Sequence, residues 1–406
     1  MKACFLFVAL VCCLLAAAQP NAYVDRYKEA FALYQKGEKQ KALDIFEKIF
    51  AEDSTETNAL YFKTVLYTEL RQFSEASKGY TQLCRMFPDN ANYWGYGSFT
   101  YTLINQPETA QFYANKAVEL DPYSYQHMLH LAHACLFLAK TNQAVYWYAR
   151  ALQWIPNQQA FEKSFLADFD LFDSLKMMPS QMAARFKEAL QPLAASIQFD
   201  SKASALLDSI LRYNGKEQSN EVKDKILAWK RAFVELEKNA EMPRQQVMAT
   251  FITDLGLQEY RNRNRVMAMR DYFGKAESIY EDTGDSLGLA NLYILLSREM
   301  LVYQRMENRF VKNPDPLRFA QKAAETIANN NLEALLPSQL HYMSEAYSIL
   351  EEDAKSLACQ WQQLAVSKRL NDGKGYFRAT NSLAVYYAGK KQIDSALYYH
   401  QLCMKE

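Results

Sequence analysis

The chain has 406 residues, which exceeds the usual size of one domain and predicts several domains or one long solenoid. Apolar residues make up 50%, charged residues 23%, and only 12 glycines and 11 prolines occur, which excludes long disordered linkers and predicts a chain ordered nearly throughout. Lys plus Arg and Asp plus Glu balance at 46 each, so the overall charge favours neither nucleic acid nor an anionic membrane as a partner.

The N-terminal segment 1–18 has the features of an export signal. Lys2 supplies a positive charge at the start, Phe5–Leu15 is an uninterrupted apolar stretch, and Ala16–Ala18 fit the small-residue cleavage rule before Gln19. We therefore expect residues 1–18 to be a signal peptide. The protein is then exported, to the periplasm or cell envelope of a Gram-negative bacterium.

A lipid anchor and a membrane span are the alternatives in this segment. Cys12 and Cys13 lie in the apolar stretch, but neither follows the small residue that bacterial lipoprotein signals show. The stretch is too short for a stable span, and no later window approaches the roughly 18 apolar residues that a span requires. We expect a mature chain without lipid and without a transmembrane segment.

Residues 23–158 repeat with a period of 34. Four alanines keep this step, namely Ala42, Ala76, Ala110 and Ala144. Three prolines keep it as well, each twelve residues after one of the last three alanines, namely Pro88, Pro122 and Pro156. Because two residue types share the step, the period belongs to whole structural units.

Each unit, counted from Tyr23, Thr57, Ala91 or Tyr125, has a small residue at position 8 and mostly a large one at position 24. Position 8 holds Ala30, Thr64, Ser98 and Ala132, and position 24 holds Phe46, Tyr80, Ala114 and Tyr148. The third unit adds Trp94 at position 4 and the ending Leu120–Pro122. This pattern resembles the tetratricopeptide repeat (TPR) family. The resemblance implies an all-α solenoid of helical hairpins that binds a partner along a groove.

Physical chemistry supports the same architecture. A small residue on the first helix, such as Ser98, facing a small residue on the second, such as Ala110, lets two antiparallel helices approach closely. One hairpin cannot bury its apolar face alone, so stacked neighbours form the core, and their rotation creates a concave surface. No strand pattern of useful length occurs, which favours an all-α fold.

The register fails after Asn157, and residues 159–242 are predicted to form irregular helices. One contains a stripe of phenylalanines spaced 4, 4 and 3, at Phe161, Phe165, Phe169 and Phe172, which could cap the array. Others are expected after Pro179 and around Ile226–Leu236.

Residues 243–406 are predicted to form a second TPR-like array. Asp285–Gly288 and Asp372–Gly375 each introduce a helix, and residues 338–350 and 354–370 are expected to pair. Phe377–Glu406 fits the repeat pattern through Leu383, Ala384, Tyr387, Ala396 and Tyr399. The spacing resembles the longer-period repeats of the same superfamily.

Four cysteines remain after the signal: Cys84, Cys135, Cys359 and Cys403. An exported compartment permits disulfides. Cys84 and Cys135 occupy helical packing positions, however, so small buried side chains are the favoured interpretation and structural bridges the alternative. No Cys-x-x-Cys pair supports a redox or zinc motif.

Motifs of catalysis are missing from the sequence, which has no phosphate-binding loop, no Gly-x-Ser-x-Gly elbow and no His-Glu-x-x-His helix. His127, His130 and His133 step round one helix by too wide an angle to close on one metal ion, so packing or groove-lining roles are favoured over a zinc site. The arginines at 261, 263, 265 and 270 are interpreted as a solvated helix and not as a nucleic-acid site. We expect no enzyme activity, cofactor or metal.

The resemblance to the TPR family also implies which side chains line the groove. Positions 2, 5, 9, 12 and 13 of the first helices commonly face the concave side in that family. Carried onto this chain, they give the candidate partner-binding residues Tyr27, Phe31, Asn58, Tyr61, Asn92, Phe99, Gln126, His133 and Phe137. Amides suit the backbone of an extended peptide, and aromatic rings suit its side chains. Ordinary exposed or half-packed helix positions are an equally open interpretation.

Two functions follow from this surface. The favoured one is a non-catalytic scaffold or adaptor of the bacterial envelope that binds an extended peptide or protein partner, of unknown identity, in the groove. The alternative is a carbohydrate-binding helical protein, because tyrosine and tryptophan faces also stack on sugars and the chain has 27 tyrosines.

Overall fold

The computed structural model describes residues 23–178, 184–188, 201–213, 219–238, 240, 244–307, 312–370 and 372–404. The predicted signal peptide, residues 1–18, and the start of the helix predicted after Pro179 lie outside these ranges. All regular structure within these ranges is helical, which confirms the all-α prediction.

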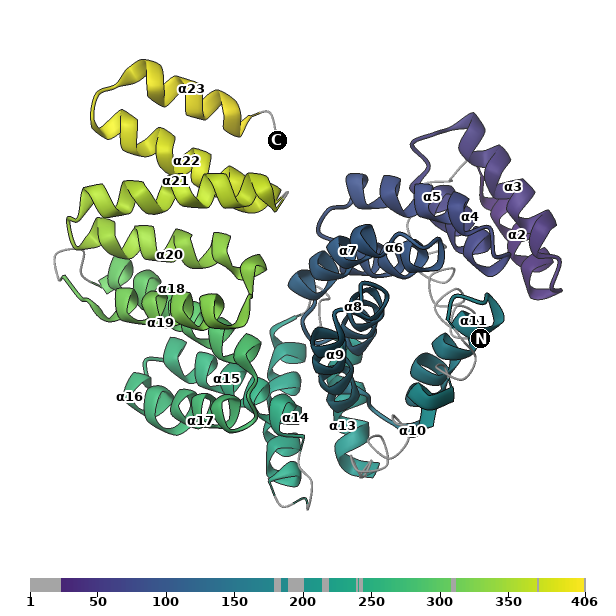
Figure 1. Cartoon of the computed structure of the whole chain (residues 1–406), viewed down its shortest axis with the longest axis horizontal. Coiled ribbons are helices and arrows are strands. Elements are labelled where there is room, and N and C mark those ends of the chain that lie inside the picture. Colours follow the sequence, from purple (N-terminus) through teal and green to yellow (C-terminus); the bar gives the residue numbers. More distant parts are fainter. Residues whose placement is uncertain are drawn as a thin grey trace. The chain divides into compact units, whose positions relative to one another are not determined.

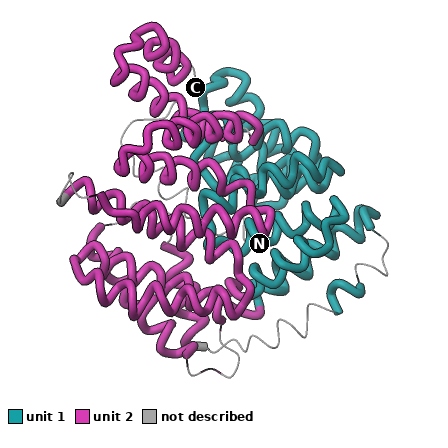
Figure 2. The backbone as a smooth tube through the Cα atoms, turned by 60° about the vertical axis from the view of Figure 1, so that its left-hand side comes forward, with its two compact units in different colours: residues 1–152, 159–191 teal, residues 153–158, 192–406 magenta. Residues whose placement is uncertain are grey.

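The chain forms two compact units (Figure 2). The first comprises residues 1–152 and 159–191, and the second comprises residues 153–158 and 192–406. The segment predicted as one irregular region, 159–242, is therefore divided between the two units, with its phenylalanine-rich part in the first.

Four helical hairpins build most of the first unit. They are α2 (Val24–Gln35) with α3 (Lys39–Glu52), α4 (Thr57–Glu69) with α5 (Phe73–Met86), α6 (Ala91–Leu103) with α7 (Pro107–Leu120), and α8 (Tyr125–Phe137) with α9 (Thr141–Trp154) (Figure 1). Helices α4, α6 and α8 begin at the residues predicted to open units two, three and four. The repeat period of the sequence is thus a period of helix pairs.

Caps and turns repeat with the same period. The residue before each of α4, α6 and α8 caps the helix, and Glu56, Asn90 and Ser124 each accept a backbone N–H of the first turn. The turn inside each hairpin has one residue in the left-handed region, at Gly37, Arg71, Asn105 and Ala139. These four residues keep the repeat period, so both ends of α4, α6 and α8 are set by local contacts.

Small residues lie where paired helices meet, as predicted. Ala30, Thr64, Ser98 and Ala132 at position 8 are fully buried, and the four periodic alanines are buried opposite them. The Ser98 hydroxyl donates to the carbonyl of Ala110 at 2.8 Å, which joins α6 directly to α7. This contact leaves no room for a longer side chain.

The phenylalanine stripe follows the fourth hairpin, on α10 (Gln158–Phe161), η1 (Glu162–Leu166) and α11 (Ala167–Ser174). Its four rings, Phe161, Phe165, Phe169 and Phe172, are completely buried. A spacing of four exceeds the roughly 3.6 residues of an α-helical turn, and the wider π-helical turn η1 compensates for the difference. The stripe packs within the first unit.

The second unit contains two further helices and a second array. Its elements are α13 (Ser201–Tyr213), α14 (Asn220–Glu237), α15 (Gln245–Arg261), α16 (Arg265–Met267), η2 (Ala268–Phe273), α17 (Gly274–Asp282), α18 (Ser286–Glu307), α19 (Asp315–Asn330), η3 (Glu333–Leu335), α20 (Leu336–Ile349), α21 (Asp353–Arg369), α22 (Gly373–Gly389) and α23 (Ile393–Cys403). Trp154 and Phe233 pack edge-on against Phe251 at the start of this unit. The buried Arg244 donates to the carbonyl of Ile155 at 3.0 Å.

The hairpins of the second array confirm the predicted pairs. Helices α20 and α21 match residues 338–350 and 354–370, and α22 with α23 matches the last predicted unit, where the rings of Tyr387 and Tyr399 stack at 5.6 Å. The Ser344 hydroxyl donates to the carbonyl of Ser356 at 3.2 Å, twelve residues on, as Ser98 does to Ala110. The left-handed turn residues Glu351 and Lys391 are more widely spaced along the chain than those of the first array, so this array has the longer period.

Candidate functional site

The nine predicted groove residues all lie on the first helices of the first array, but they differ in exposure. Tyr27, Phe31 and His133 are core residues with exposed fractions of 7%, 8% and 0%. Asn92 is exposed, and the half-buried ones are Asn58, Tyr61, Phe99, Gln126 and Phe137. The three core residues therefore do not line an open groove, because neighbouring helices cover their rings.

The amides at position 2 form the accessible part of this face. Asn58, Asn92 and Gln126 lie in the first turns of α4, α6 and α8, one repeat apart. The backbone N–H groups of Asn58 and Asn92 bind the caps Glu56 and Asn90 at 3.2 and 3.1 Å. Within the described chain, the three side-chain amides have no hydrogen-bond partner, so they are available to a ligand.

Tyr61 lies beside this amide row on α4. Its ring packs against Phe62 at 5.3 Å and Tyr93 at 5.8 Å between ring centres. Burial, with smaller effects of the neighbouring tyrosines, raises the pKa of the Tyr61 hydroxyl. The hydroxyl therefore stays neutral at physiological pH and can donate a hydrogen bond.

The other half of the predicted groove is occupied by α11 of the same chain. Phe172 contacts Phe99 of α6 and Phe137 of α8, with ring centres 6.1 and 5.2 Å apart. Phe169 contacts Tyr148 of α9 at 6.0 Å. The stripe, predicted as a cap on the end of the array, thus covers the first-helix face of units three and four.

A buried polar chain joins α11 to the array. His133 Nδ1 lies 2.8 Å from the Tyr148 hydroxyl, and His133 Nε2 lies 3.1 Å from Asp168 Oδ2. A neutral ring protonated on Nε2 satisfies both contacts, because it donates to the carboxylate and accepts from the hydroxyl. Burial raises the pKa of Asp168, and the hydrogen bond from His133 opposes this shift.

The other two histidines of α8 are buried without an ionic partner. Burial lowers the pKa of His127 to about 4, and it lowers that of His130 well below its ordinary value. The His130 ring stacks on Phe99 at 5.0 Å, and His127 lies so close to Gly95 that a Cβ there would be 2.4 Å from Nδ1. The described part of the chain contains no group of three or more His, Cys, Asp or Glu residues that could hold a metal ion.

The four cysteines are buried and unpaired. Burial raises the pKa of the Cys84 thiol to about 12, and the pKa values of Cys135 and Cys359 rise for the same reason. The interpretation of these side chains as small packing residues is confirmed.

Sequence reasoning missed two sets of polar residues. Tyr148 and Asp168 join His133 from α9 and α11, and only the position of the half-buried Asp168 inside the phenylalanine stripe signalled that it lies near the core. Arg261, interpreted as part of a solvated helix, binds Glu299 of α18 through two hydrogen bonds. The spacing of these two residues in the sequence did not predict that their side chains are in contact.

Hairpin packing, the regular repeat period and the small-residue contacts define a helical-repeat protein of the tetratricopeptide type in its fold. No family model matches the chain, and no curated protein matches it.

Two solved structures are similar at low sequence identity. The crystal structure of yeast Tom70 has 10% identity and a TM-score of 0.31, over 94% of this chain and 91% of Tom70. The structure of Naa15/Naa10 bound to HypK-THB has 12% identity and a TM-score of 0.26, over 91% of this chain and 61% of the matched chain. Because both scores are low, the fold assignment rests on the repeat geometry above.

Among the residues that the structure describes, no helix has the length and apolar character needed to cross a membrane.

Proposed function

We propose that this protein is a non-catalytic scaffold that holds an extended segment of a protein partner on the first-helix face of its first array. The observation that carries the proposal is the row of unpartnered amides, Asn58, Asn92 and Gln126, at one repeat position of three successive units. A side-chain amide both donates and accepts, so such a row can bind peptide backbone of any sequence.

The position of α11 supports this proposal. On the same face, over units three and four, the array binds a segment of its own chain through Phe169 and Phe172, which contact His133 of α8. First-helix side chains of this array therefore suit contact with polypeptide. The aromatic neighbour of the open amides, Tyr61, offers a partner the same kind of contact.

Photocrosslinking tests the location of the partner. A photoreactive phenylalanine analogue is placed at the position of Asn92, and the protein is irradiated in the cells that produce it. We expect an adduct with a protein there and none from the position of Asn115, an exposed amide on the second helix α7. Adducts of equal yield from both positions would contradict the proposed face.

The captured partner then allows a quantitative comparison. Asn58→Ala, Asn92→Ala and Gln126→Ala together should weaken its binding, because each lost hydrogen bond contributes about 0.5 to 1.5 kcal/mol. The matched control replaces three amides of the second helices, Gln82, Asn115 and Asn142, with alanine and should bind as the wild type does. If the Asn58, Asn92 and Gln126 variant loses binding to soluble glycans but still binds the protein partner, the carbohydrate alternative is favoured.

We also propose that the protein works after export, in the envelope of a Gram-negative bacterium, on the basis of the signal-like residues 1–18. The intact mass of the protein isolated from its own cells should correspond to a chain that begins at or near Gln19 and carries no acyl group. A mass that includes Lys2, or one increased by lipid, would contradict this proposal.

A further inference from the structure

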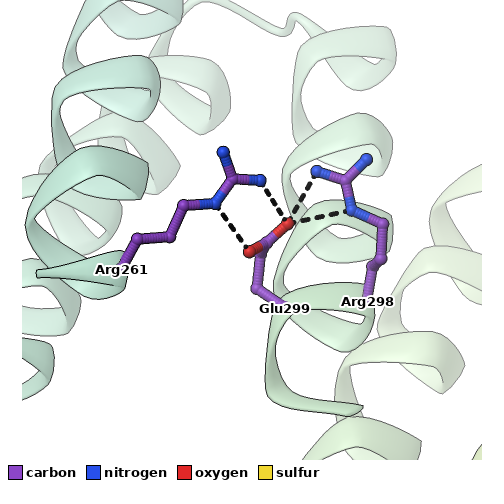
Figure 3. Close-up of polar contacts among 3 residues, drawn as sticks. All are labelled: Arg261, Arg298 and Glu299. Carbon is purple, nitrogen blue, oxygen red and sulfur yellow. Dashed lines mark hydrogen bonds and ion pairs between the residues drawn. The ribbon is translucent and has the colours of Figure 1, made fainter. Parts of the chain in front are cut away.

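Two arginines bind one carboxylate in the second unit (Figure 3). Arg261 of α15 donates from Nε and Nη2 to Glu299 of α18 at 3.0 and 2.9 Å. Arg298, the residue before Glu299, donates from Nε and Nη2 to the same carboxylate at 3.0 and 2.8 Å. Figure 3 shows the two guanidinium groups reaching Glu299 from opposite sides. Two positive charges thus share one negative charge.

This cluster keeps unused donors. Each guanidinium group has five N–H groups and uses two nitrogens on Glu299, so both retain N–H groups for another acceptor. Burial alone would raise the pKa of Glu299, but the hydrogen bonds and charges of Arg261 and Arg298 outweigh it and lower the pKa. The carboxylate is therefore ionised at neutral pH, and the cluster carries a net charge of +1.

The same face of the array continues with two further arginines. Arg305, two helical turns after Arg298 on α18, pairs with Glu345 of α20 at 2.8 Å. His341 of α20 lies 3.5 Å from Glu345, and α22, which packs against α20, carries Arg378. Burial lowers the pKa of His341, Glu345 opposes this shift, and Arg378 and Arg305 add to it. Within the described residues, Arg378 makes no hydrogen bond or ion pair.

The row Arg261, Arg298, Arg305 and Arg378 therefore carries an excess of positive charge. It faces two carboxylates, Glu299 and Glu345, and one histidine whose pKa is lowered, so the sum near neutral pH is four positive charges against two negative ones. All four come from first helices of hairpins, α15, α18 and α22, and the first helix α20 lies between α18 and α22 in the order of the chain. We refer to these four arginines as the ledge.

The ledge is accessible and has apolar neighbours. The side chains of Arg261, Arg298 and Arg305 are 54%, 39% and 53% exposed. Val302 and Met306, on the same stretch of α18, are exposed hydrophobic side chains. A ligand on this surface contacts both guanidinium groups and a small apolar area. Such a surface suits a polypeptide segment that carries both acidic and apolar side chains.

The spacing of the arginines selects the geometry of the ligand. Arg298 and Arg305 are seven residues apart on a helix, which corresponds to a rise of about 10.5 Å. In a segment with the extended polyproline II conformation, which has three residues per turn, residues three apart lie on the same side and are separated by about 9.3 Å. Carboxylates at that spacing can each meet a guanidinium group, and guanidinium groups bind carboxylates through paired hydrogen bonds.

We propose that the first-helix face of the second array binds an acidic, extended segment of a protein partner through Arg261, Arg298, Arg305 and Arg378. The charge excess supplies the attraction, and the unused N–H groups supply the hydrogen bonds. This surface belongs to the second unit and is independent of the amide row of the first array. Either proposal can fail without the other.

Fluorescence anisotropy with a labelled acidic peptide tests the inference. The probe has glutamate at every third position between glycine and serine, and a second probe has glutamine in place of each glutamate. We expect the wild-type chain to bind the glutamate peptide, more weakly as salt increases, and not the glutamine peptide. Equal affinity for the two peptides would overturn the proposal.

Arginine variants locate the binding surface. Arg298→Gln, Arg305→Gln and Arg378→Gln together should weaken binding about tenfold or more, since exposed ion pairs contribute up to about 1 kcal/mol each. The matched control, with Arg270→Gln, Arg318→Gln and Arg369→Gln on η2, α19 and α21, changes the net charge equally and should stay within about twofold. An equal loss in both triple variants would show a general charge effect and overturn the assignment.

A single variant keeps the test valid if the triple variant loses its fold. Arg378→Gln breaks no ion pair of the described chain, so its circular dichroism and melting curve should match the wild type, while peptide affinity falls about threefold. Unchanged affinity in this folded variant would contradict the proposal. A different ligand would also contradict the proposal. This outcome requires that the acidic peptide does not bind, and that a single-stranded oligonucleotide or vesicles of anionic phospholipid bind in a way that depends on these arginines.

Discussion

Small side chains at the contact between paired helices set how closely the two helices approach. Ala110 and Ala144 are buried at this contact, and the Ser98 hydroxyl reaches the carbonyl of Ala110 at 2.8 Å. Because the interior is close-packed, added carbon atoms have to displace a helix or a neighbouring side chain.

We predict that Ala110→Leu and Ala144→Leu each lower the free energy of unfolding by about 1 to 3 kcal/mol through overpacking. Urea titration followed by circular dichroism measures this change. Leucine at an exposed position on α7, as in Asn115→Leu, is the control and should be nearly neutral. Unchanged stability of both buried variants would mean that the assumed register of the repeats is wrong.

One backbone position in each hairpin turn is left-handed, and four different residue types occupy it. Gly37 has φ of 82° and Ala139 has φ of 56°. A left-handed conformation costs a residue with a side chain about 1 to 2 kcal/mol, and glycine avoids this cost. The turn therefore forms because the hairpin packing requires it, even with alanine.

We predict opposite effects of two exchanges at this position. Ala139→Gly should raise the free energy of unfolding by about 1 kcal/mol, the relief of backbone strain less the extra freedom of the unfolded chain. Gly37→Ala should lower it by a similar amount, although no atom lies within 4 Å of the added methyl group. Two changes of the same sign, measured by thermal unfolding, would contradict a backbone origin.

At the scale of elements, the stability of α8 depends on pH through two buried histidines, His127 and His130. The folded pKa of His127 is about 4, below the ordinary value of 6.5, because burial disfavours the charged ring, and that of His130 is lowered for the same reason. Above pH 6.5 the ring is neutral in both states and its stability contribution is complete. As the pH falls from 6.5 towards 4, the unfolded chain binds protons that the folded chain does not, and stability is lost.

We predict that His127 alone costs about 1.4 kcal/mol of stability per pH unit in that window, and that His130 adds a loss of the same sign. The melting temperature of the first unit should fall between neutral and mildly acidic pH. Asp168 acts in the opposite direction, because its raised pKa makes the folded state take up a proton first. The comparison is therefore with His127→Gln and His130→Gln together, whose melting temperature should depend less on pH. An equal slope in this variant would refute the assignment to α8.

Helix α11 shows what pattern analysis can and cannot establish for a single element. The spacing of Phe161, Phe165, Phe169 and Phe172 predicted a buried helical stripe next to the array, and all four rings are buried. The surface that they cover was not predictable, because spacing fixes only which side chains share a face. Their packing on Phe99, His133 and Phe137 is a tertiary contact that also removes half of the predicted groove.

At the scale of the whole chain, the repeat period was sufficient to predict the first array, since one local rule repeats in every hairpin. The second array was less regular, and its pairs were predicted from helix starts such as Asp285–Gly288 and Asp372–Gly375. The arginine ledge was not predictable. Arg261 and Glu299 are 38 residues apart with no common period, so only the packing of α15 beside α18 brings them together.

We predict that stability is uneven along the second array. The hairpin of α22 and α23 exposes several hydrophobic side chains, namely Phe377, Val385, Ile393, Leu397, Tyr398 and Met404. Each repeat is stabilised by its neighbours, so a hairpin with an uncovered apolar face opens at lower free energy. Hydrogen exchange should be faster for backbone amides of α23 than for those of α19. Equal protection of the two helices would show that the uncovered face is buried in solution.

The attachment of α11 to the array that it covers has a consequence for competition. Only α10 and η1 connect α9 to α11, so the helix is held near its binding face at an effective concentration on the order of millimolar. A ligand that needs Phe99 or Phe137 binds only those molecules from which α11 has departed. Its apparent dissociation constant rises by the inverse of that fraction. Ligands of the amide row do not compete with α11. One array therefore has two binding regions, and only in the region of Phe99 and Phe137 does the affinity depend on the departure of α11.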